Sequence, residues 1–155
     1  MGSRDYNIGI KWARDDERDS LLSPIIYHLN FASGYDLEIT PSITPLKVAS
    51  QLHPLELFGA AIFTSNVNSY LRICNQNNLK IVSCGGEAQV SIDPGIKTRE
   101  VIKYILLKPR FVFEECNTEL KRALAVRLIH EARADCAIDS NLNLDLQIEP
   151  LLIWS

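Results

Sequence analysis

Short apolar segments alternate with longer amphipathic segments along most of this chain, and this alternation restricts its fold more than any other feature. Residues 6–12 and 35–40 alternate apolar with polar side chains, as half-buried strands do. Residues 59–64 are apolar throughout, which is typical of a strand buried on both faces. Residues 118–133 place leucine and isoleucine on one face at helical spacing. Strands and helices are therefore expected to follow one another along the chain.

The same patterns assign the remaining elements. Further strands are predicted over residues 79–83, 88–92, 111–115, 134–138 and 146–153, and further helices over residues 15–30, 44–52, 66–75 and 98–107. The last strand is broken by Pro150, which places it at a sheet edge. Because parallel strands need crossover helices, this order predicts an α/β fold with mainly parallel sheets.

The length of 155 residues suits a single domain, residues 1–155. Within it, either one sheet holds all the strands, or two small lobes, residues 4–84 and 87–155, meet at a hinge near residues 85–87. Residues 1–3 (Met-Gly-Ser) are typical of a vector remnant, so we expect the natural protein to be longer.

Composition excludes several classes of protein. Hydrophobic residues make up 46% and charged residues 23%, as in soluble globular proteins. A net charge of -3 argues against a broad nucleic-acid-binding surface, so nucleic acid is expected only through a domain missing here. No apolar run is long enough to span a membrane and no signal peptide is seen, which predicts a cytoplasmic protein without membrane contact.

The four cysteines, Cys74, Cys84, Cys116 and Cys136, have no pair with the C-x2-C spacing of a zinc or redox site. Cys116 and Cys136 lie in apolar segments, where cysteine behaves as a small hydrophobic residue. We therefore expect reduced, structural cysteines and no metal or cofactor site. A disulfide between Cys74 and Cys84 is left open by the sequence.

The segment SIDPGIKT, residues 91–98, is similar to the first catalytic segment of ribonuclease-H-like nucleases. In those enzymes an aspartate at a strand end begins a carboxylate cluster that holds two metal ions. The resemblance would make Asp93 the centre of such a cluster, with Glu114 and either Asp135 or Asp139. The alternative is a strand, turn and helix cap, which the predicted helix directly after this segment favours.

Three segments of the second half form a recognisable series: VSIDPGIKTREVIKYILL, then FVFEE, then ELKRALAVRLIHEARADCAID. This series resembles the second lobe of the type II periplasmic-binding-protein fold, and the elements of the first half are compatible with its first lobe. Domains of that family are usually longer than this chain. The resemblance implies the effector domain of a bacterial transcription regulator, or a cytoplasmic relative.

In open α/β sheets, ligands bind beyond the carboxyl ends of the strands, where loops and helix N-termini converge. The residues predicted at these ends are Lys11, Trp12, Ser65, Asn66, Asp93, Lys97, Thr98, Asp139 and Ser140. Their hydroxyl, amide and ammonium groups suit a small anionic ligand. The alternative is that these residues only cap helices.

The sequence therefore favours a non-enzymatic domain that senses a small anionic ligand, forms a homodimer and responds by movement about residues 85–87. No catalytic residue is assigned in this hypothesis. One alternative is a protein-interaction or scaffold domain of a larger viral or multidomain protein. The other is the metal-dependent nuclease centred on Asp93.

Overall fold

The computed structural model describes residue 6 and residues 8–11, 27–39, 52–93, 101–114 and 118–155. The chain divides into two compact units, Met1–Leu57 and Phe58–Ser155. Some sequence predictions lie outside the described residues: those for Trp12, Lys97, Thr98 and Cys116, for most of the helices expected over 15–30 and 44–52, and for the start of the helix expected over 98–107.

The first unit contains a three-stranded antiparallel sheet in the order β1-β2-β3. Its strands are β1 (Ile8–Lys11), β2 (Tyr27–Phe31) and β3 (Asp36–Ile39). In β2, Leu29 is buried and both of its neighbours are exposed, a two-residue period that a strand satisfies and a helix does not. The strands predicted over 6–12 and 35–40 are confirmed where they are described, but the end of the helix predicted over 15–30 is wrong.

Helix α1 (Pro54–Gln76) begins at a cap that the local sequence explains. The Nδ1 atom of His53 accepts a hydrogen bond from the N–H of Leu55 at 3.1 Å, and the carboxylate of Glu56 accepts one from the N–H of His53 at 2.8 Å. These bonds occupy two of the donors that a helix start leaves unpaired, and Pro54 lacks an N–H that would need a partner.

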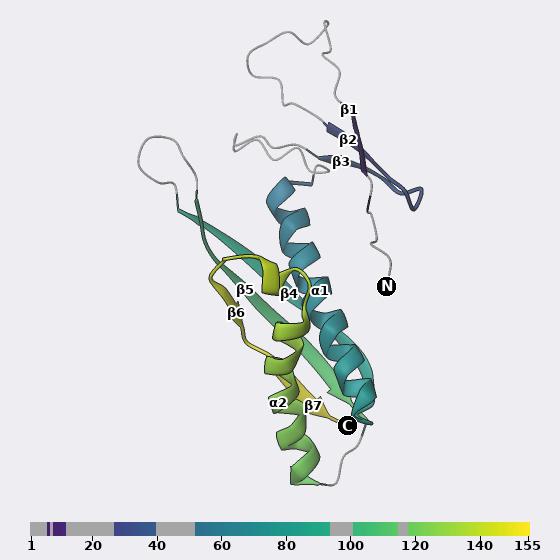
Figure 1. The fold of residues 1–155 in the computed structure, drawn as a ribbon, viewed down its shortest axis with the longest axis vertical. Coiled ribbons are helices and arrows are strands. Elements are labelled where there is room, and N and C mark those ends of the chain that lie inside the picture. The colour runs from purple at the N-terminus through teal and green to yellow at the C-terminus, as the bar shows by residue number, and fades with distance from the viewer. Residues whose placement is uncertain (1–5, 7, 12–26, 40–51, 94–100, 115–117) are drawn as a thin grey trace, which may run out of the picture. The chain divides into compact units, whose positions relative to one another are not determined.

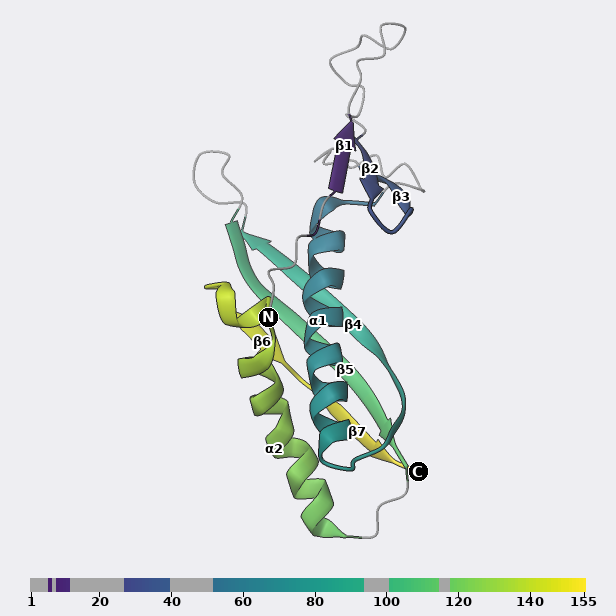
Figure 2. The same ribbon diagram turned by 45° about the vertical axis from the view of Figure 1, so that its right-hand side comes forward.

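The second unit contains a mixed four-stranded sheet with α1 and α2 side by side on one of its faces (Figures 1 and 2). Its further elements are β4 (Ile81–Asp93), β5 (Val101–Phe113), α2 (Glu119–Asp135), the 3-10 turn η2 (Asp139–Asn141), β6 (Leu146–Ile148) and β7 (Leu151–Trp154). The long strands β4 and β5 pair antiparallel, whereas β6 and β7 pair with β5 one after the other in parallel.

The core of the second unit lies between the two helices and β5. The side chains of Ile105, Leu107, Phe111 and Phe113 are at most 2% exposed, and Pro109 on the same face is also buried. The residues that alternate with these five along β5 are more exposed. This alternation turns one face of β5 towards the helices. On α2 the buried residues include Ala125 and Ala132, and the Tyr70 hydroxyl of α1 donates to the carbonyl oxygen of Ala125 at 2.8 Å.

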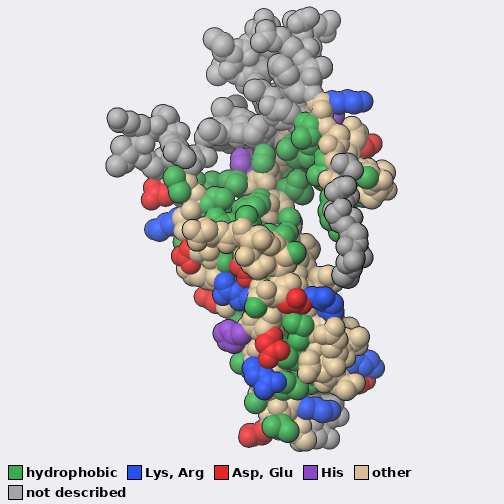
Figure 3. All heavy atoms as spheres, viewed as in Figure 1, with side chains coloured by type: hydrophobic (Ala, Val, Ile, Leu, Met, Phe, Trp, Pro, Cys, Tyr) green, Lys and Arg blue, Asp and Glu red, His purple; other side chains and the backbone are tan. Residues whose placement is uncertain are grey.

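The outer face of α2 carries charges of both signs. Figure 3 shows basic and acidic side chains interspersed over this region of the second unit. One pair, Arg127 and Glu131, is spaced by four residues and joined at 3.3 Å between Nε and Oε1. Such a pair contributes only a few tenths of a kcal/mol to the stability of the fold. Both side chains are more than half exposed, so this face of α2 is solvated.

The prediction of mainly parallel sheets is wrong, because three segments have the opposite secondary structure from the one their patterns suggested. Residues 59–64, predicted as a strand, lie within α1, and residues 101–107, predicted as a helix, lie within β5. Residues 134–138, predicted as a strand, cover the end of α2 and the turn after it. Without the helix that was expected after residue 98, β4 and β5 need no crossover and pair as neighbours in opposite directions.

Other predictions are confirmed. The helix over 118–133 corresponds to α2, and residues 66–75 lie in α1. The strand over 146–153 is present and is interrupted at Pro150, so that β6 and β7 are separate strands on the same side of β5. Proline has no N–H to donate to a sheet, which explains the interruption.

Residues 85–87, where a hinge between two lobes was expected, lie inside β4, and the two compact units divide after Leu57. Gly86 has a φ of 141°, and a Cβ atom there would collide with the carbonyl oxygen of Lys108 and lie 2.9 Å from the Cα of Pro109. A Cβ atom on Gly85 would meet no other atom within 4 Å. Gly86 is therefore required by the close approach of β5, and Gly85 is not.

We expect Gly86→Ala to lower the free energy of unfolding by about 2 kcal/mol or more, because it combines a strained φ with a backbone collision. Gly85→Ala is the matched control, and its stability should stay the same or rise by up to about 1 kcal/mol. Urea unfolding followed by circular dichroism measures both. Equal stability of the two variants would show that β4 and β5 are not in this register.

Candidate active site

The side chain of Cys136 meets that of Ser65 where the end of α2 packs against α1. The Sγ atom of Cys136 lies 3.1 Å from the Oγ atom of Ser65, and the cysteine is 0% exposed. Seventy-one residues of sequence separate them. Cys136 is the residue that follows the last turn of α2, and its N–H donates to the carbonyl oxygen of Arg133 at 3.2 Å.

The turn after α2 fixes the backbone of Cys136. Both the N–H and the hydroxyl of Ser140 donate to the carbonyl oxygen of Cys136, at 3.0 and 2.7 Å. The Nε of Arg133 pairs with the Oδ2 of Asp139 at 3.0 Å, and its Nη2 donates to the carbonyl oxygen of Leu146 at 3.2 Å. These bonds join α2, η2 and β6, so the thiol is held on a well-connected part of the fold.

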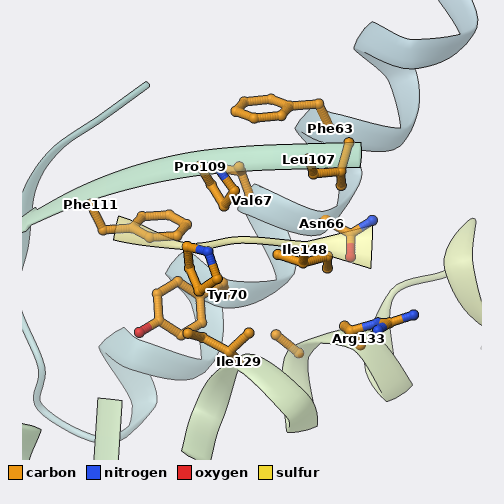
Figure 4. A pocket seen from close by; sticks show the side chains of 12 residues that line it. Phe63, Asn66, Val67, Tyr70, Leu107, Pro109, Phe111, Ile129, Arg133 and Ile148 are labelled. Atoms are coloured by element: carbon orange, nitrogen blue, oxygen red, sulfur yellow. The ribbon is translucent and has the colours of Figure 1, made fainter. Parts of the chain in front are cut away.

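A pocket with a cavity of about 20 Å³ lies between α1, α2 and the sheet, near the helical turns that carry the thiol (Figure 4). Most of its wall is apolar, and it includes Phe63, Val67, Tyr70, Leu107, Pro109, Phe111, Ile129 and Ile148. This cavity has room for about one water molecule, so an organic ligand needs the surrounding side chains to move apart. The wall of the pocket therefore favours apolar groups over polar ones.

The polar side chains of the pocket, Asn66 and Arg133, lie together at one end of it (Figure 4). Asn66 directly follows Ser65, and Arg133 lies three residues before Cys136. Asn66 is 7% exposed, and its Nδ2 donates to the carbonyl oxygen of Ile62 at 3.0 Å. The polar end of the pocket is thus built from the same turns of α1 and α2 that carry Ser65 and Cys136.

The other described cysteines lie elsewhere, and neither is oxidised. Cys74 and Cys84 are both free, so the disulfide that the sequence left open is not formed. Burial raises the pKa of the Cys74 thiol to about 11, and the same cause raises the pKa of Tyr70, whose hydroxyl donates to the carbonyl oxygen of Ala125. A thiol with so high a pKa is a poor nucleophile at neutral pH. Cys84 is exposed on β4.

Of the predicted ligand-binding residues, Ser65 and Ser140 contact Cys136, Asn66 lines the pocket, and Asp139 pairs with Arg133. They do not stand at the ends of parallel strands, because Ser65 and Asn66 lie inside α1 and the other two lie in η2. Asp93 ends β4, and Lys11 belongs to β1 in the other unit. The sequence does not predict a role for Cys136, Arg133 or the pocket, because its pattern places Cys136 in a strand over residues 134–138 as a small hydrophobic residue.

The carboxylates of the nuclease hypothesis are used for other contacts. Glu114 pairs with Lys80 at 2.8 Å, Asp135 pairs with Arg72, and Asp139 pairs with Arg133. The described residues contain no group of three metal-ligating side chains. This arrangement offers no two-metal carboxylate cluster of the kind a nuclease needs.

No family model and no curated protein sequence matches this chain. Solved structures do match it over nearly its whole length. An OsmC-like protein of unknown function from Vibrio cholerae has a TM-score of 0.82 at 18% identity, covering 96% of this chain and 100% of that one. An OsmC-like protein from Mycoplasma pneumoniae has a TM-score of 0.73 at 11% identity, covering 98% and 99%. The organic hydroperoxide resistance protein OhrB of Bacillus subtilis has a TM-score of 0.60 at 15% identity, covering 94% and 97%.

The protein thus has the fold of OsmC-like and organic hydroperoxide resistance proteins: an α/β fold with two sheets in which antiparallel pairs predominate. The resemblance to type II periplasmic-binding proteins, and with it the assignment to transcription regulation, is wrong. These neighbours also count against the three functions inferred from sequence, namely ligand sensing, a scaffold and a nuclease. Among the described residues, no helix is long and apolar enough to cross a membrane.

Proposed function

We propose that this protein reduces organic hydroperoxides with the thiol of Cys136. The observation that carries the proposal is a buried thiol, held 3.1 Å from the Ser65 hydroxyl, on the helical turns that line an apolar pocket. The fold shared with a protein named for organic hydroperoxide resistance supports the same chemistry. In this proposal the apolar side chains of the pocket move apart to take the organic group, and a thiol supplies two electrons to break an O–O bond.

The first step is attack of the Cys136 thiolate on the terminal oxygen of the hydroperoxide, R–O–O–H. An S–O bond forms, the O–O bond breaks, and the leaving alkoxide takes a proton to become the alcohol R–OH. Cys136 is oxidised to a sulfenic acid, and the hydroperoxide is reduced by the same two electrons. The Ser65 hydroxyl lies 3.1 Å from the sulfur and is placed to donate a hydrogen bond to it during the attack.

The second step uses an external thiol. Among the described residues, the side chain in contact with the Cys136 sulfur is a serine, and Cys74 and Cys84 are elsewhere in the fold. A small thiol attacks the sulfenic sulfur, which forms a mixed disulfide and releases water. A second molecule of that thiol attacks the mixed disulfide, which releases the oxidised small thiol and restores Cys136.

The pocket sets the preference among peroxides. The organic group of cumene hydroperoxide buries apolar surface against this wall, whereas hydrogen peroxide has no such group. With dithiothreitol as the external thiol, we expect kcat/KM for cumene hydroperoxide to exceed that for hydrogen peroxide by roughly tenfold or more. Equal values for the two would show that the pocket takes no part in the reaction.

A replacement in the pocket wall gives the matched test of that preference. Val67→Asp places a charge where the wall is apolar and should lower kcat/KM for cumene hydroperoxide while leaving that for hydrogen peroxide within roughly twofold. Val126→Asp, on the exposed surface of α2, is the control and should leave both values unchanged. Circular dichroism checks that both variants are folded.

A further inference from the structure

The charge of Arg133 is already balanced inside the protein. Its Nε lies 3.0 Å from the Asp139 carboxylate, whose side chain is 12% exposed, and its Nη2 donates to the carbonyl oxygen of Leu146 at 3.2 Å. Among the described residues that line the pocket, the buried Tyr70 phenol is the other ionisable side chain. A carboxylate entering the pocket would therefore meet an arginine that already has its counter-ion, and would lie near the negative charge of Asp139.

Asn66 supplies a hydrogen-bond acceptor at the same end. Its Nδ2 is used by the carbonyl oxygen of Ile62, and its Oδ1 has no hydrogen bond to the described residues. The side chain is 93% buried, and Figure 4 shows this oxygen on the side of the carboxamide that faces Arg133. A buried acceptor without a partner is unfavourable, so it favours a ligand that brings an O–H donor.

We propose that the pocket selects uncharged molecules that carry an apolar group and an O–H group, and discriminates against carboxylates. The O–H donates to Asn66 Oδ1, and the apolar group packs against the wall that includes Val67 and Phe111. Resting on the proposed function, this inference identifies the substrates as neutral hydroperoxides and the product as a neutral alcohol. It differs from the anion site that the sequence predicts, because Arg133, the cation among the described lining residues, is already neutralised by Asp139.

The test is direct binding, without turnover, in the full chain carrying Cys136→Ser. The probes are 2-phenyl-2-propanol, a neutral alcohol, and 2-phenylpropanoate, an anion of similar size, each titrated by NMR at neutral pH. We expect the alcohol to bind at least roughly tenfold more tightly than the anion. Anion binding as tight as alcohol binding, or no shift of residues around the pocket with either probe, would overturn the inference.

Two variants separate the contributions of Asn66 and Asp139. Asn66→Leu keeps the volume and removes the acceptor, so alcohol affinity should fall by roughly fivefold to tenfold. Asp139→Asn keeps the shape and leaves Arg133 without its counter-ion, so anion affinity should rise while alcohol affinity changes little. Unchanged affinities in both variants would contradict the assigned contacts.

The binding result is independent of catalysis. If the wild-type protein fails to reduce any hydroperoxide and the alcohol still binds preferentially, the proposed function is wrong. The preference of the pocket for uncharged ligands is then still supported. If turnover is observed but the carboxylate probe binds as well as the alcohol, the proposed function stands and the selectivity is wrong.

Discussion

Replacing Cys136 with serine will abolish the reduction of cumene hydroperoxide, with a loss in kcat/KM of roughly 1,000-fold or more. The reason is that the thiol is the nucleophile, and removing a nucleophile removes the whole covalent pathway. Serine is close to cysteine in size and leaves the contact with Ser65 available, so the fold should be retained. The measurement is hydroperoxide consumption with dithiothreitol in excess, corrected for the rate without protein.

Cys84→Ser is the control for this experiment, because Cys84 is the exposed thiol among the described cysteines. An exposed thiol reacts slowly with peroxides without help from the protein, and its removal should change the rate by less than roughly twofold. Should the activity follow Cys84 and survive Cys136→Ser, the reaction would be surface oxidation and the buried site would have no catalytic role.

A second cysteine in place of Ser65 should change how the oxidised protein is resolved. In Ser65→Cys the new sulfur takes the place of an oxygen that lies 3.1 Å from the Sγ of Cys136. A small adjustment brings two such sulfurs to the bonding distance of about 2.05 Å. One equivalent of cumene hydroperoxide should therefore give an intramolecular disulfide and water, so that the intact mass falls by two hydrogens. The wild-type protein should instead gain one oxygen.

Thr64→Cys is the matched control for this variant. Thr64 is the preceding residue of α1, is exposed, and bonds through its hydroxyl to the carbonyl oxygen of Ala60, away from the thiol. This variant should keep the mass gain of the wild type. If Thr64→Cys formed the disulfide and Ser65→Cys did not, α1 would present a different face to Cys136 from the one described here.

The elements that the sequence identified correctly are those whose signals are local. The helix that ends near Arg133 repeats its apolar residues over four turns, which identifies it without knowledge of its neighbours. Pro150 interrupts a strand because it has no N–H to donate, whichever strand is the partner. Residues 59–64 were misassigned because a short apolar run suits a buried strand and a buried helix equally well. A helix over residues 101–107 would have connected two parallel strands. Because these residues form part of β5 instead, β4 and β5 pair antiparallel.

The site was less predictable than the fold. Ser65, Asn66, Asp139 and Ser140 were selected by an argument about strand ends, and the structure gathers them for a different reason, the packing of α1 against the end of α2. That they bind a ligand stays a prediction, as does the homodimer. The contact between Ser65 and Cys136 joins residues far apart in sequence, and no spacing rule within one chain reveals such a pair.

The most direct measurement is to trap the oxidised cysteine. The wild-type protein is treated with one equivalent of cumene hydroperoxide in the presence of dimedone, which reacts with sulfenic acids, and the adduct is located by peptide mass spectrometry. We expect the adduct on Cys136, with cumyl alcohol formed in equal amount. An adduct confined to Cys84 or Cys116, or alcohol formed while Cys136 stays unmodified, would contradict the assignment of this thiol.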